Sequence, residues 1–241
     1  MPSVLVADVG GTNTTFGIFT TSPHEITLHS IYSYSSNSIA DFAEEVAEVL
    51  TKVPPPQQAC FAVAGPITRN GEYCQLTNLP WVIDAGKIAQ RTGIKPSLIN
   101  DFEAIGYGID ALPAEDILQI KEGTAQTHGT RALLGAGTDL GKSILVWNEE
   151  KKYYIPLPSE GGHGPLAVQS EQEYLLSQFL QAQHQYTDIT WGDVLSGRGI
   201  TAMYTSLGGR KYHEPAEIAA HHAMDKECKE TMQLFTRFYA R

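Results

Sequence analysis

Two glycine-rich stretches interrupt apolar runs of this sequence with residue types that can hold phosphate. Residues 8–13 read DVGGTN and follow the apolar run VLVA, and residues 135–141 read GAGTDLG. Glycines in a tight turn between strands let backbone N–H groups approach a phosphate, because no Cβ blocks the way, and threonine adds a hydroxyl donor. Asp8 is also suited to hold Mg²⁺ or its waters. The pattern predicts two phosphate-binding hairpins, with a plain glycine turn as the alternative for the first.

The second stretch also has to be weighed as a P-loop, because residues 136–143 end in Gly-Lys-Ser. A P-loop follows a strand and opens a helix whose first amides hold the phosphates. Residues 143–157 read SILVWNEEKKYYIPL, which is rich in β-branched and aromatic residues and lacks helical apolar spacing. The Rossmann fingerprint fails as well, since the glycine spacing is GxGxxxG. A hairpin that matches the first is therefore favoured over a P-loop NTPase.

Two further groups of polar residues could carry chemistry. Asn100 and Asp101 end the apolar run PSLI, and strand ends of α/β layers face ligands. A carboxylate at Asp101 can accept a proton from an attacking hydroxyl, or it can cap the helix predicted from DFEAIGYGI. Glu160 and His163 lie in SEGGHG, which indicates a loop that offers hydrogen bonds to a hydroxylated ligand. Ordinary loop residues and a metal site are the alternatives for that pair.

Composition narrows the function classes. The chain has 241 residues, 42% of them hydrophobic, and its formal net charge of −10 comes without the basic stripe of nucleic-acid binders. No apolar run approaches the ~20 residues of a membrane span, and the N-terminus lacks signal-peptide features. The three cysteines have no CxxC spacing, which indicates reduced thiols. We therefore expect a cytoplasmic protein without nucleic-acid or membrane partners.

The predicted strands and helices that position these groups follow one order in the first half of the chain, and a similar strand-rich pattern starts again in the second half. The first half reads βββαβα and then a further strand, with strands at 4–10, 14–20, 26–34, 58–65 and 96–101 and helices at 38–50 and 84–93. Ser38 and Gly93 are the predicted caps of those helices. After residue 110 strands are predicted at 131–137, 143–148 and 152–158, and helices after the capping-box pair Ser170 and Glu173, near Ser196, and at 228–241.

The last predicted helix carries a large apolar face. Its apolar residues are Met232, Leu234, Phe235, Phe238 and Tyr239, and the sequence ends at Arg241 without a polar tail. An apolar helix face needs cover. We expect that the chain is short of a further segment or that a partner, such as a second copy in a homodimer, covers this face.

Taken in order, seven stretches resemble the bacterial glucokinase family, a branch of the sugar kinase/heat-shock 70/actin superfamily. They are DVGGTN (8–13), AVAGPI (62–67), LTNLPW (76–81), INDFEAIGYGI (99–109), LGAGTDLG (134–141), LPSEGGHGPLA (157–167) and VLSGRGI (194–200). The resemblance implies an α/β fold of the ribonuclease H-like, actin-like ATPase type, with two domains around a central cleft, each on a βββαβα-type core. The domains are expected at residues 1–106 and 107–241, the second of them incomplete.

The resemblance also implies ATP-dependent phosphorylation of glucose, or a related hexose, with ATP and Mg²⁺ as cofactors. The implied phosphate-holding residues are Asp8, Gly10, Gly11, Thr12, Asn13, Gly135, Gly137 and Thr138, with Asp8 also the metal ligand. The implied catalytic base is Asp101. The implied sugar contacts are Asn78, Asn100, Asp101, Glu160, His163 and Asp193.

Three departures from the family pattern weaken the expectation of full kinase activity. The family's glycine-rich adenosine motif is absent from the sequence, so we expect this chain to bind ATP poorly and to have little kinase activity. Gly192 stands where the family usually has a sugar-binding Glu, with Asp193 one position late, which predicts weaker sugar affinity. Asp139 replaces a frequent Gly and adds negative charge near the phosphates, which Lys142 or Mg²⁺ could offset. A catalytically weak sugar-binding or regulatory relative is therefore the alternative function.

Overall fold

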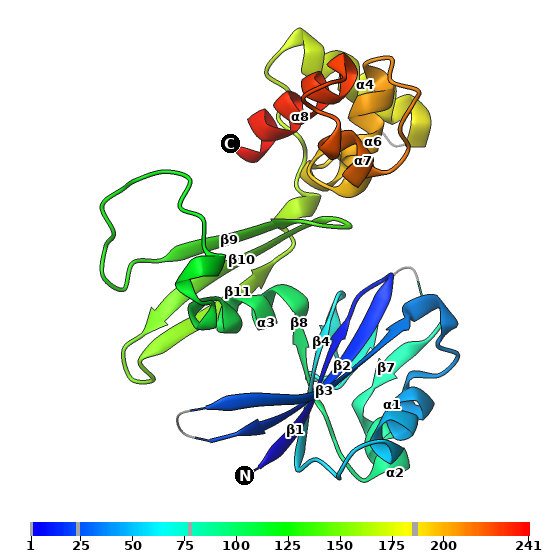
Figure 1. The fold of residues 1–241 in the computed structure, drawn as a ribbon, viewed down its shortest axis with the longest axis vertical. Coiled ribbons are helices and arrows are strands. Elements are labelled where there is room, and N and C mark those ends of the chain that lie inside the picture. Colours follow the sequence, from blue (N-terminus) through cyan, green and yellow to red (C-terminus); the bar gives the residue numbers. More distant parts are fainter. Residues whose placement is uncertain (1, 23–24, 77–78, 185–187) are drawn as a thin grey trace. The chain divides into compact units, whose positions relative to one another are not determined.

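The computed structural model describes residues 2–22, 25–76, 79–184 and 188–241. Contacts within the chain divide it into two compact units, Met1–Thr124 and Ala125–Arg241 (Figure 1). The domain boundary that we placed between residues 106 and 107 lies inside helix α3 (Asp101–Gly108) and stays a prediction.

A mixed sheet forms the centre of the first unit, with strand order β3-β2-β1-β4-β8. Its strands are β1 (Ser3–Val9), β2 (Asn13–Thr21), β3 (Ile26–Ser35), β4 (Gln58–Val63) and β8 (Ser97–Asn100). β1, β2 and β3 are antiparallel neighbours, whereas β1, β4 and β8 run parallel to one another. Each of these strands overlaps a segment that the apolar patterning predicted.

Helices α1 (Phe42–Thr51) and α2 (Ala85–Thr92) contact each other beside this sheet (Figure 1). The core of the unit joins α1 and α2 to the sheet and includes Leu5, Phe16, Phe42, Val46, Val49, Phe61 and Ile88. The rings of Phe16 and Phe42 stack with centroids 5.8 Å apart. The predicted cap of α2 at Gly93 is present, with a φ of 78°. Asp84, where the helix was predicted to begin, is the N-cap, and its carboxylate accepts from Lys87 N–H at 3.0 Å.

The predicted start of α1 at Ser38 is wrong. Asp41 is the N-cap, and its Oδ1 accepts from the N–H groups of Ala43 at 2.8 Å and Glu44 at 3.2 Å. A carboxylate at the N-cap also interacts favourably with the positive end of the helix dipole. Ser38 instead ends the short 3₁₀ helix η1 (Ser36–Ser38).

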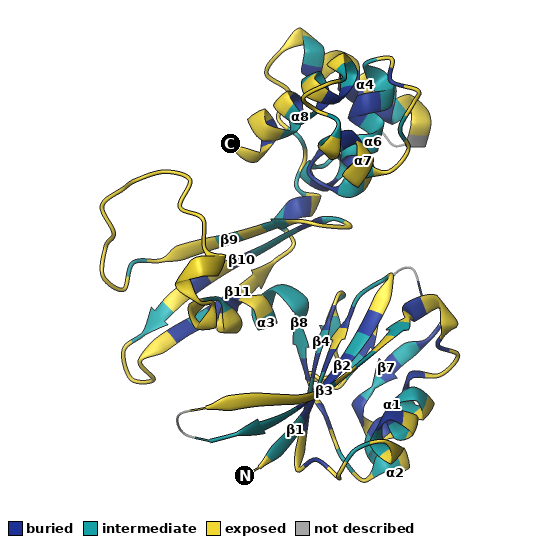
Figure 2. Ribbon diagram, in the orientation of Figure 1, coloured by how far each residue is buried: buried dark blue, intermediate teal, exposed yellow. Residues whose placement is uncertain are grey.

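A small antiparallel sheet and further short helices complete the first unit. The sheet has the order β5-β6-β7. Its strands are β5 (Ile67–Thr68), β6 (Tyr73–Gln75) and β7 (Val82–Asp84), and the 3₁₀ helices η2 (Ile109–Ala111) and η3 (Ala114–Asp116) follow α3. All residues from 111 to 128 are exposed (Figure 2).

The second unit begins with an antiparallel sheet of order β11-β10-β9. Its strands are β9 (Arg131–Ala136), β10 (Leu140–Asn148) and β11 (Tyr153–Ser159). Lys142 and Ser143 lie within β10, where they pair with Leu134 and Leu133 of β9. The Gly-Lys-Ser stretch is therefore part of a strand and opens no helix, so the P-loop alternative is wrong.

Helices form the rest of the second unit. They are η4 (Gly161–His163), α4 (Glu171–His184), α5 (Trp191–Val194), α6 (Gly197–Ser206), α7 (Pro215–Ala220) and α8 (Lys226–Tyr239). Leu234 and Phe238 of α8 are each 1% exposed and belong to one core with Leu176, Leu180 and Met203. The unit itself therefore covers much of the apolar face that we expected to need outside cover. Among the described residues, no helix combines the length and the apolar character that spanning a bilayer requires.

Candidate functional site

The first glycine stretch is the tight turn between β1 and β2. Val9 pairs with Thr14, and Gly10 N–H donates to the Asn13 carbonyl at 3.0 Å. A Cβ at Gly10 would lie 3.3 Å from that carbonyl oxygen, whereas Gly11 faces open space. Desolvation raises the pKa of the Asp8 carboxyl above its ordinary value. A turn with an open glycine backbone beside such a carboxylate suits the approach of a phosphate with its cation.

Ser36 fixes the backbone of this turn from η1. Its hydroxyl donates to the Gly10 carbonyl at 2.7 Å and lies 2.9 Å from the Thr14 hydroxyl. Its N–H donates to the Thr12 carbonyl at 2.9 Å, and its own carbonyl accepts from Trp81 Nε1 at 3.1 Å. The Ser36 and Thr14 side chains are fully buried. Sequence reasoning did not find this support, because it joins residues that lie 22 to 45 positions apart.

Strand register brings the first turn to the same sheet edge as Asn100 and Asp101. Val9 of β1 pairs with Val63 of β4, and Val63 pairs with Asn100 of β8, both in parallel alignment. Two strand spacings of about 4.8 Å place Asn100 about 10 Å across the sheet from Val9. The predicted base and the turn predicted to hold phosphate thus share the carboxyl ends of neighbouring parallel strands, where α/β sheets bind ligands.

Asn100, rather than Asp101, is the N-cap of α3. Its Oδ1 accepts from Phe102 N–H at 2.9 Å and from Glu103 N–H at 3.3 Å. Asp101 is the first helical residue, and its Oδ1 also accepts from Phe102 N–H at 2.9 Å. The alternative that made Asp101 the cap is therefore wrong. Burial and, to a lesser extent, the Asp101 charge raise the pKa of the Cys74 thiol to about 11.

Asn78, the remaining predicted sugar contact of the first unit, lies outside the described residues, and its role stays a prediction. The described residues of the same stretch are mostly apolar and buried. Leu76, Leu79 and Trp81 belong to the core of the unit. The core thus fixes the two flanks of the predicted sugar segment.

The second glycine stretch is the turn between β9 and β10. Gly135 lies in the paired part of β9, and Gly137, Thr138 and Asp139 form the connection. Gly137 N–H donates to the Asp139 carbonyl at 3.0 Å, much as Gly10 N–H closes the first turn. The Gly137 carbonyl accepts from the N–H of Gly197, the first residue of α6, at 2.9 Å. This turn is thereby tied to the helical part of its unit.

Side chains from η4, α5 and α6 form a polar cluster beside the second turn. Arg198 Nη2 lies 3.0 Å from Asp139 Oδ2 and 3.4 Å from Asp193 Oδ1. His163 Nε2 lies 3.6 Å from Asp139 Oδ2, and its Nδ1 lies 3.3 Å from Glu160 Oε2. The side chains of Glu160 and His163 are 76% and 64% exposed. The structure thus brings the predicted sugar ligands of the second unit together in a place that solvent reaches.

Asp193 has a structural role that the sequence did not reveal. Its Oδ2 accepts from the N–H of Thr190 at 2.9 Å and from the Thr190 hydroxyl at 2.8 Å, which caps α5. Its side chain is 11% exposed. A sugar contact by Asp193 would compete with this cap and stays a prediction. Arg198 was not singled out from the sequence, because only the fold pairs it with Asp139, 59 positions away.

The first turn offers a magnesium ion one carboxylate rather than a set of protein ligands. Across the described ranges of the chain, no group of three or more His, Cys, Asp or Glu residues could hold a metal. Mg²⁺ usually keeps several waters and binds through one or two carboxylates together with substrate phosphates. Asp8 therefore fits a magnesium ion that arrives with a phosphate ligand, and does not fit a resident metal centre.

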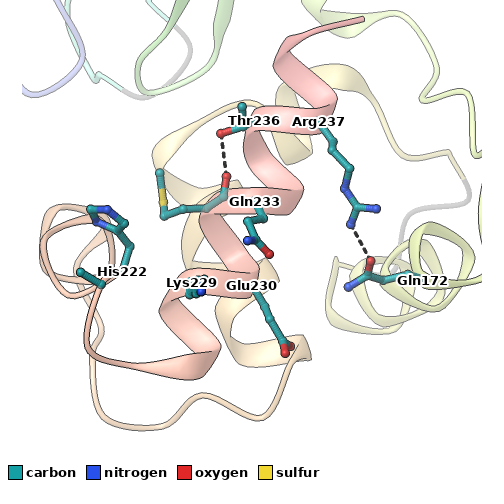
Figure 3. Close-up of a pocket in the computed structure, with 9 residues that line it drawn as sticks. Gln172, His222, Lys229, Glu230, Gln233, Thr236 and Arg237 are labelled. Atoms are coloured by element: carbon teal, nitrogen blue, oxygen red, sulfur yellow. Dashed lines mark hydrogen bonds between the residues drawn. The ribbon is translucent and has the colours of Figure 1, made fainter.

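A groove of about 900 Å³ on the second unit contains none of the predicted site residues (Figure 3). Its walls include His222, Lys229, Glu230 and the pair Arg237 and Gln172. Arg237 Nη2 donates to Gln172 Oε1 at 2.6 Å, which links α8 to α4. The groove adds no residue to the chemistry predicted from the sequence.

The chain is similar to glucokinases along nearly its whole length. The glucokinase family model matches residues 5–241. The glucokinase of Trichormus variabilis is 39% identical over 226 residues, which cover 91% of this chain and 65% of that relative. The chain spans between 60% and 65% of the length of the first four curated relatives, all of them glucokinases.

Solved structures share the fold. A glucokinase from an Antarctic psychrotroph has a TM-score of 0.77 at 29% identity, covering 99% of this chain and 76% of that one. The glucokinase of Balamuthia mandrillaris, solved in complex with glucose, has a TM-score of 0.81 at 21% identity, covering 100% and 74%. The predicted fold class, an α/β fold of the actin-like ATPase type, is confirmed.

Proposed function

This chain belongs to the glucokinase family, and on that premise we propose that its activity is transfer of the γ-phosphoryl group of ATP to glucose. The products are glucose 6-phosphate and ADP, and the reaction is the first step of glycolysis. The observation that carries the proposal is the strand register that places Asn100 and Asp101 at the same sheet edge as the turn 8–13. A carboxylate base and a phosphate-holding turn on one rigid edge supply the positioning on which phosphoryl transfer depends.

In the proposed reaction, the Asp101 carboxylate accepts the proton of the 6-hydroxyl as that oxygen attacks the γ-phosphorus. The bond from this phosphorus to the β,γ-bridging oxygen breaks, and ADP leaves. Asn100 donates its side-chain N–H₂ to the sugar, because its Oδ1 is used to cap α3. Glu160 and His163 hold further hydroxyls. The glycine turns hold the phosphates of Mg·ATP, with Asp8 bonded to the ion or its waters.

The proposal is tested by a coupled assay of glucose phosphorylation on the full chain. Asp101→Asn should lower kcat about 10²- to 10⁴-fold, the usual worth of a general base. Asp116→Asn is the matched control, since Asp116 is an exposed residue of η3. Unchanged turnover in Asp101→Asn would show that Asp101 is not the base. A wild-type chain that phosphorylates no hexose would overturn the kinase proposal itself.

A sugar-binding module with little catalysis is the second candidate. It is favoured by Gly192 and by the use of Asp193 as a cap, which together leave the acceptor site without an expected carboxylate. Titration calorimetry with glucose, mannose and glucosamine, together with the coupled assay, separates the two candidates, because the module binds a hexose without turning it over. The same titrations identify the preferred acceptor.

Location and assembly complete the proposal. The cytoplasm supplies ATP and keeps unpaired thiols such as those of Cys60, Cys74 and Cys228 reduced. A homodimer is also proposed, from the partly exposed apolar residues of α8, where Tyr239 is 39% exposed. Light scattering over a concentration series tests the dimer.

A further inference from the structure

The Asp139 carboxylate faces η4 and α6 rather than the tip of the second turn. Its Oδ1 accepts from Leu140 N–H at 2.8 Å. Its Oδ2 is shared between Arg198 Nη2 at 3.0 Å and His163 Nε2 at 3.6 Å. The negative charge that the sequence placed against the phosphates is therefore paired with Arg198, on the side of the acceptor loop.

Gly192 leaves the space that this carboxylate occupies. It is buried in α5, and a Cβ at this position would overlap Asp139 Oδ1 and lie 2.9 Å from the carboxyl carbon. No side chain fits at 192 while Asp139 keeps its place. The glycine at 192 and the aspartate at 139, which the sequence shows as two separate departures, form one steric unit.

His163 lies between two carboxylates. Asp139 Oδ2 faces its Nε2, and Glu160 Oε2 lies 3.3 Å from its Nδ1. The side chain is nevertheless 64% exposed, so a ligand can reach the ring from solvent. A side chain held in orientation before the ligand arrives loses less entropy on binding.

We propose that Asp139 positions the His163 imidazole for contact with a hexose hydroxyl, and that glycine is required at 192 to admit the Asp139 carboxylate. This inference rests on the proposed function, since it adds a positioning residue to the same acceptor site. The second phosphate turn thereby sets affinity for the acceptor as well as for the phosphoryl donor. Asp139 acts through His163 and makes no sugar contact of its own.

Calorimetric titration of the full chain with glucose tests the proposal through Asp139→Asn, His163→Gln and the double variant. Asp139→Asn keeps the shape of the side chain and the oxygen that accepts from Leu140 N–H. It should raise the Kd for glucose about tenfold, because the negative charge that faces His163 Nε2 at 3.6 Å is lost. In the His163→Gln background the same change should alter Kd by less than about twofold, because the two residues act as one unit.

Gly192→Ala should weaken binding about as much as Asp139→Asn, since its methyl group displaces the carboxylate. Gly123→Ala is the matched control, because a Cβ there meets nothing within 4 Å, and it should leave Kd unchanged. The inference would be overturned if Asp139→Asn changed the Kd for glucose equally in the wild-type and His163→Gln backgrounds, or changed it in neither. In both cases, hexose binding by the wild-type chain would still support the acceptor site. A wild-type chain that binds no hexose would overturn the proposed function and this inference together. Melting temperatures show whether Gly192→Ala folds. If it does not fold, the comparison of Asp139→Asn, His163→Gln and the double variant tests the proposal by itself.

Discussion

At the scale of single residues, two side chains that are predicted to contact the sugar, Asn100 and Asp193, also cap a helix. Asn100 can do both, because its oxygen caps α3 while its N–H₂ group offers two donors. Asp193 has acceptors only, and both of its oxygens have partners, Thr190 on one and Arg198 on the other. The chemistry of the side chain thus decides whether a cap is compatible with a ligand contact.

Asn100 provides a test that separates the two roles. Asn100→Asp keeps an acceptor for the N–H groups of Phe102 and Glu103, so its melting temperature should stay near that of the wild type, while glucose binding weakens. Asn100→Ala loses the cap as well, which should cost about 1 kcal/mol of stability. Thermal denaturation and glucose titration of both variants check this. Wild-type glucose affinity in Asn100→Asp would argue that the amide N–H₂ makes no sugar contact.

At the scale of elements, buried hydroxyl groups connect the first glycine turn, the predicted phosphate site, to its neighbours. Ser36 of η1 bonds to Gly10 and Thr12 of the turn, to Thr14 of β2, and to Trp81 before β7. The bonds to Gly10 and Thr14 are made by the Ser36 hydroxyl, so loss of this hydroxyl leaves two groups without a partner, at a cost of about 1–3 kcal/mol for a buried group. The geometry of the turn therefore depends on an element that the phosphate motif does not include.

Ser36→Ala should lower the free energy of unfolding by about 2 kcal/mol, because the Gly10 carbonyl loses its 2.7 Å bond and the Thr14 hydroxyl its 2.9 Å bond. Ser33→Ala is a matched control from the same sheet. Ser33 makes an exposed hydroxyl pair with Thr15 across β2 and β3, and its loss should change stability by less than about 0.5 kcal/mol. Urea denaturation measures both. Equal costs in the two variants would contradict the role assigned to Ser36.

The buried carboxylate of Glu173 links α4 to the end of α8. Burial would raise its pKa, but the bonds from Arg241 and from Gln169 N–H at 2.8 Å lower it further, so that the pKa lies below its ordinary value. The predicted capping box is half formed: Glu173 N–H donates to the Ser170 hydroxyl at 3.3 Å, while the Glu173 side chain accepts from Gln169 instead of Ser170. The pair with Arg241 thus adds a charge-assisted contact between two helices.

The Glu173 contact predicts a pH-dependent stability. Because the pKa is lowered on folding, the carboxylate stabilises the fold above its unfolded pKa of about 4.3, and this is lost as pH falls through the folded value. Glu173→Gln should therefore cost about 2 kcal/mol at pH 7 and little near pH 3. Glu171→Gln, an exposed change in the same helical turn, should have a small effect at both pH values. Denaturation at several pH values measures this, and a pH-independent cost would contradict it.

At the scale of the whole molecule, the chain consists of two compact units, and the boundary between them along the chain lies in an exposed segment. Contacts divide it after Thr124, within the exposed run 111–128 (Figure 2). Leu118 and Ile120 of this run are 86% and 93% exposed. A segment of this kind is open to proteases while packed elements resist them.

Limited trypsin digestion should cut first after Lys121, because it is the single Lys or Arg residue within the exposed run 111–128. The expected products are fragments of residues 1–121 and 122–241, identified by mass spectrometry. Lys121→Gln should slow the first cut and serves as the control. First cuts inside helices, for example after Lys87 of α2 or Lys229 of α8, would show that the units are less well packed than their cores indicate.

The sequence by itself determined the strands of the two larger sheets, most of the helices and the positions of the two glycine turns, whereas it did not reveal the short strands β5, β6 and β7. Apolar periodicity and glycine placement are local signals, and they sufficed for β1, β2, the cap of α2 at Gly93 and the strand that excludes a P-loop. Order along the chain also sufficed for the family, because seven short stretches in one order are far more specific than any of them alone.

Only the tertiary structure decided how those residues are supported. Ser36 reaches Gly10 across 26 positions, and Arg198 reaches Asp139 across 59, through pairings that no local pattern encodes. Two helix caps depended on backbone geometry. The local sequence allowed either Ser38 or Asp41 as the cap of α1 and either Asn100 or Asp101 as the cap of α3, and the structure has Asp41 and Asn100. In the sequence, Gly192 and Asp139 are two separate departures from the family pattern. In the fold, the Asp139 carboxylate occupies the space that a Cβ at position 192 would fill. Steric exclusion acts between neighbours in space, and a sequence records only neighbours along the chain.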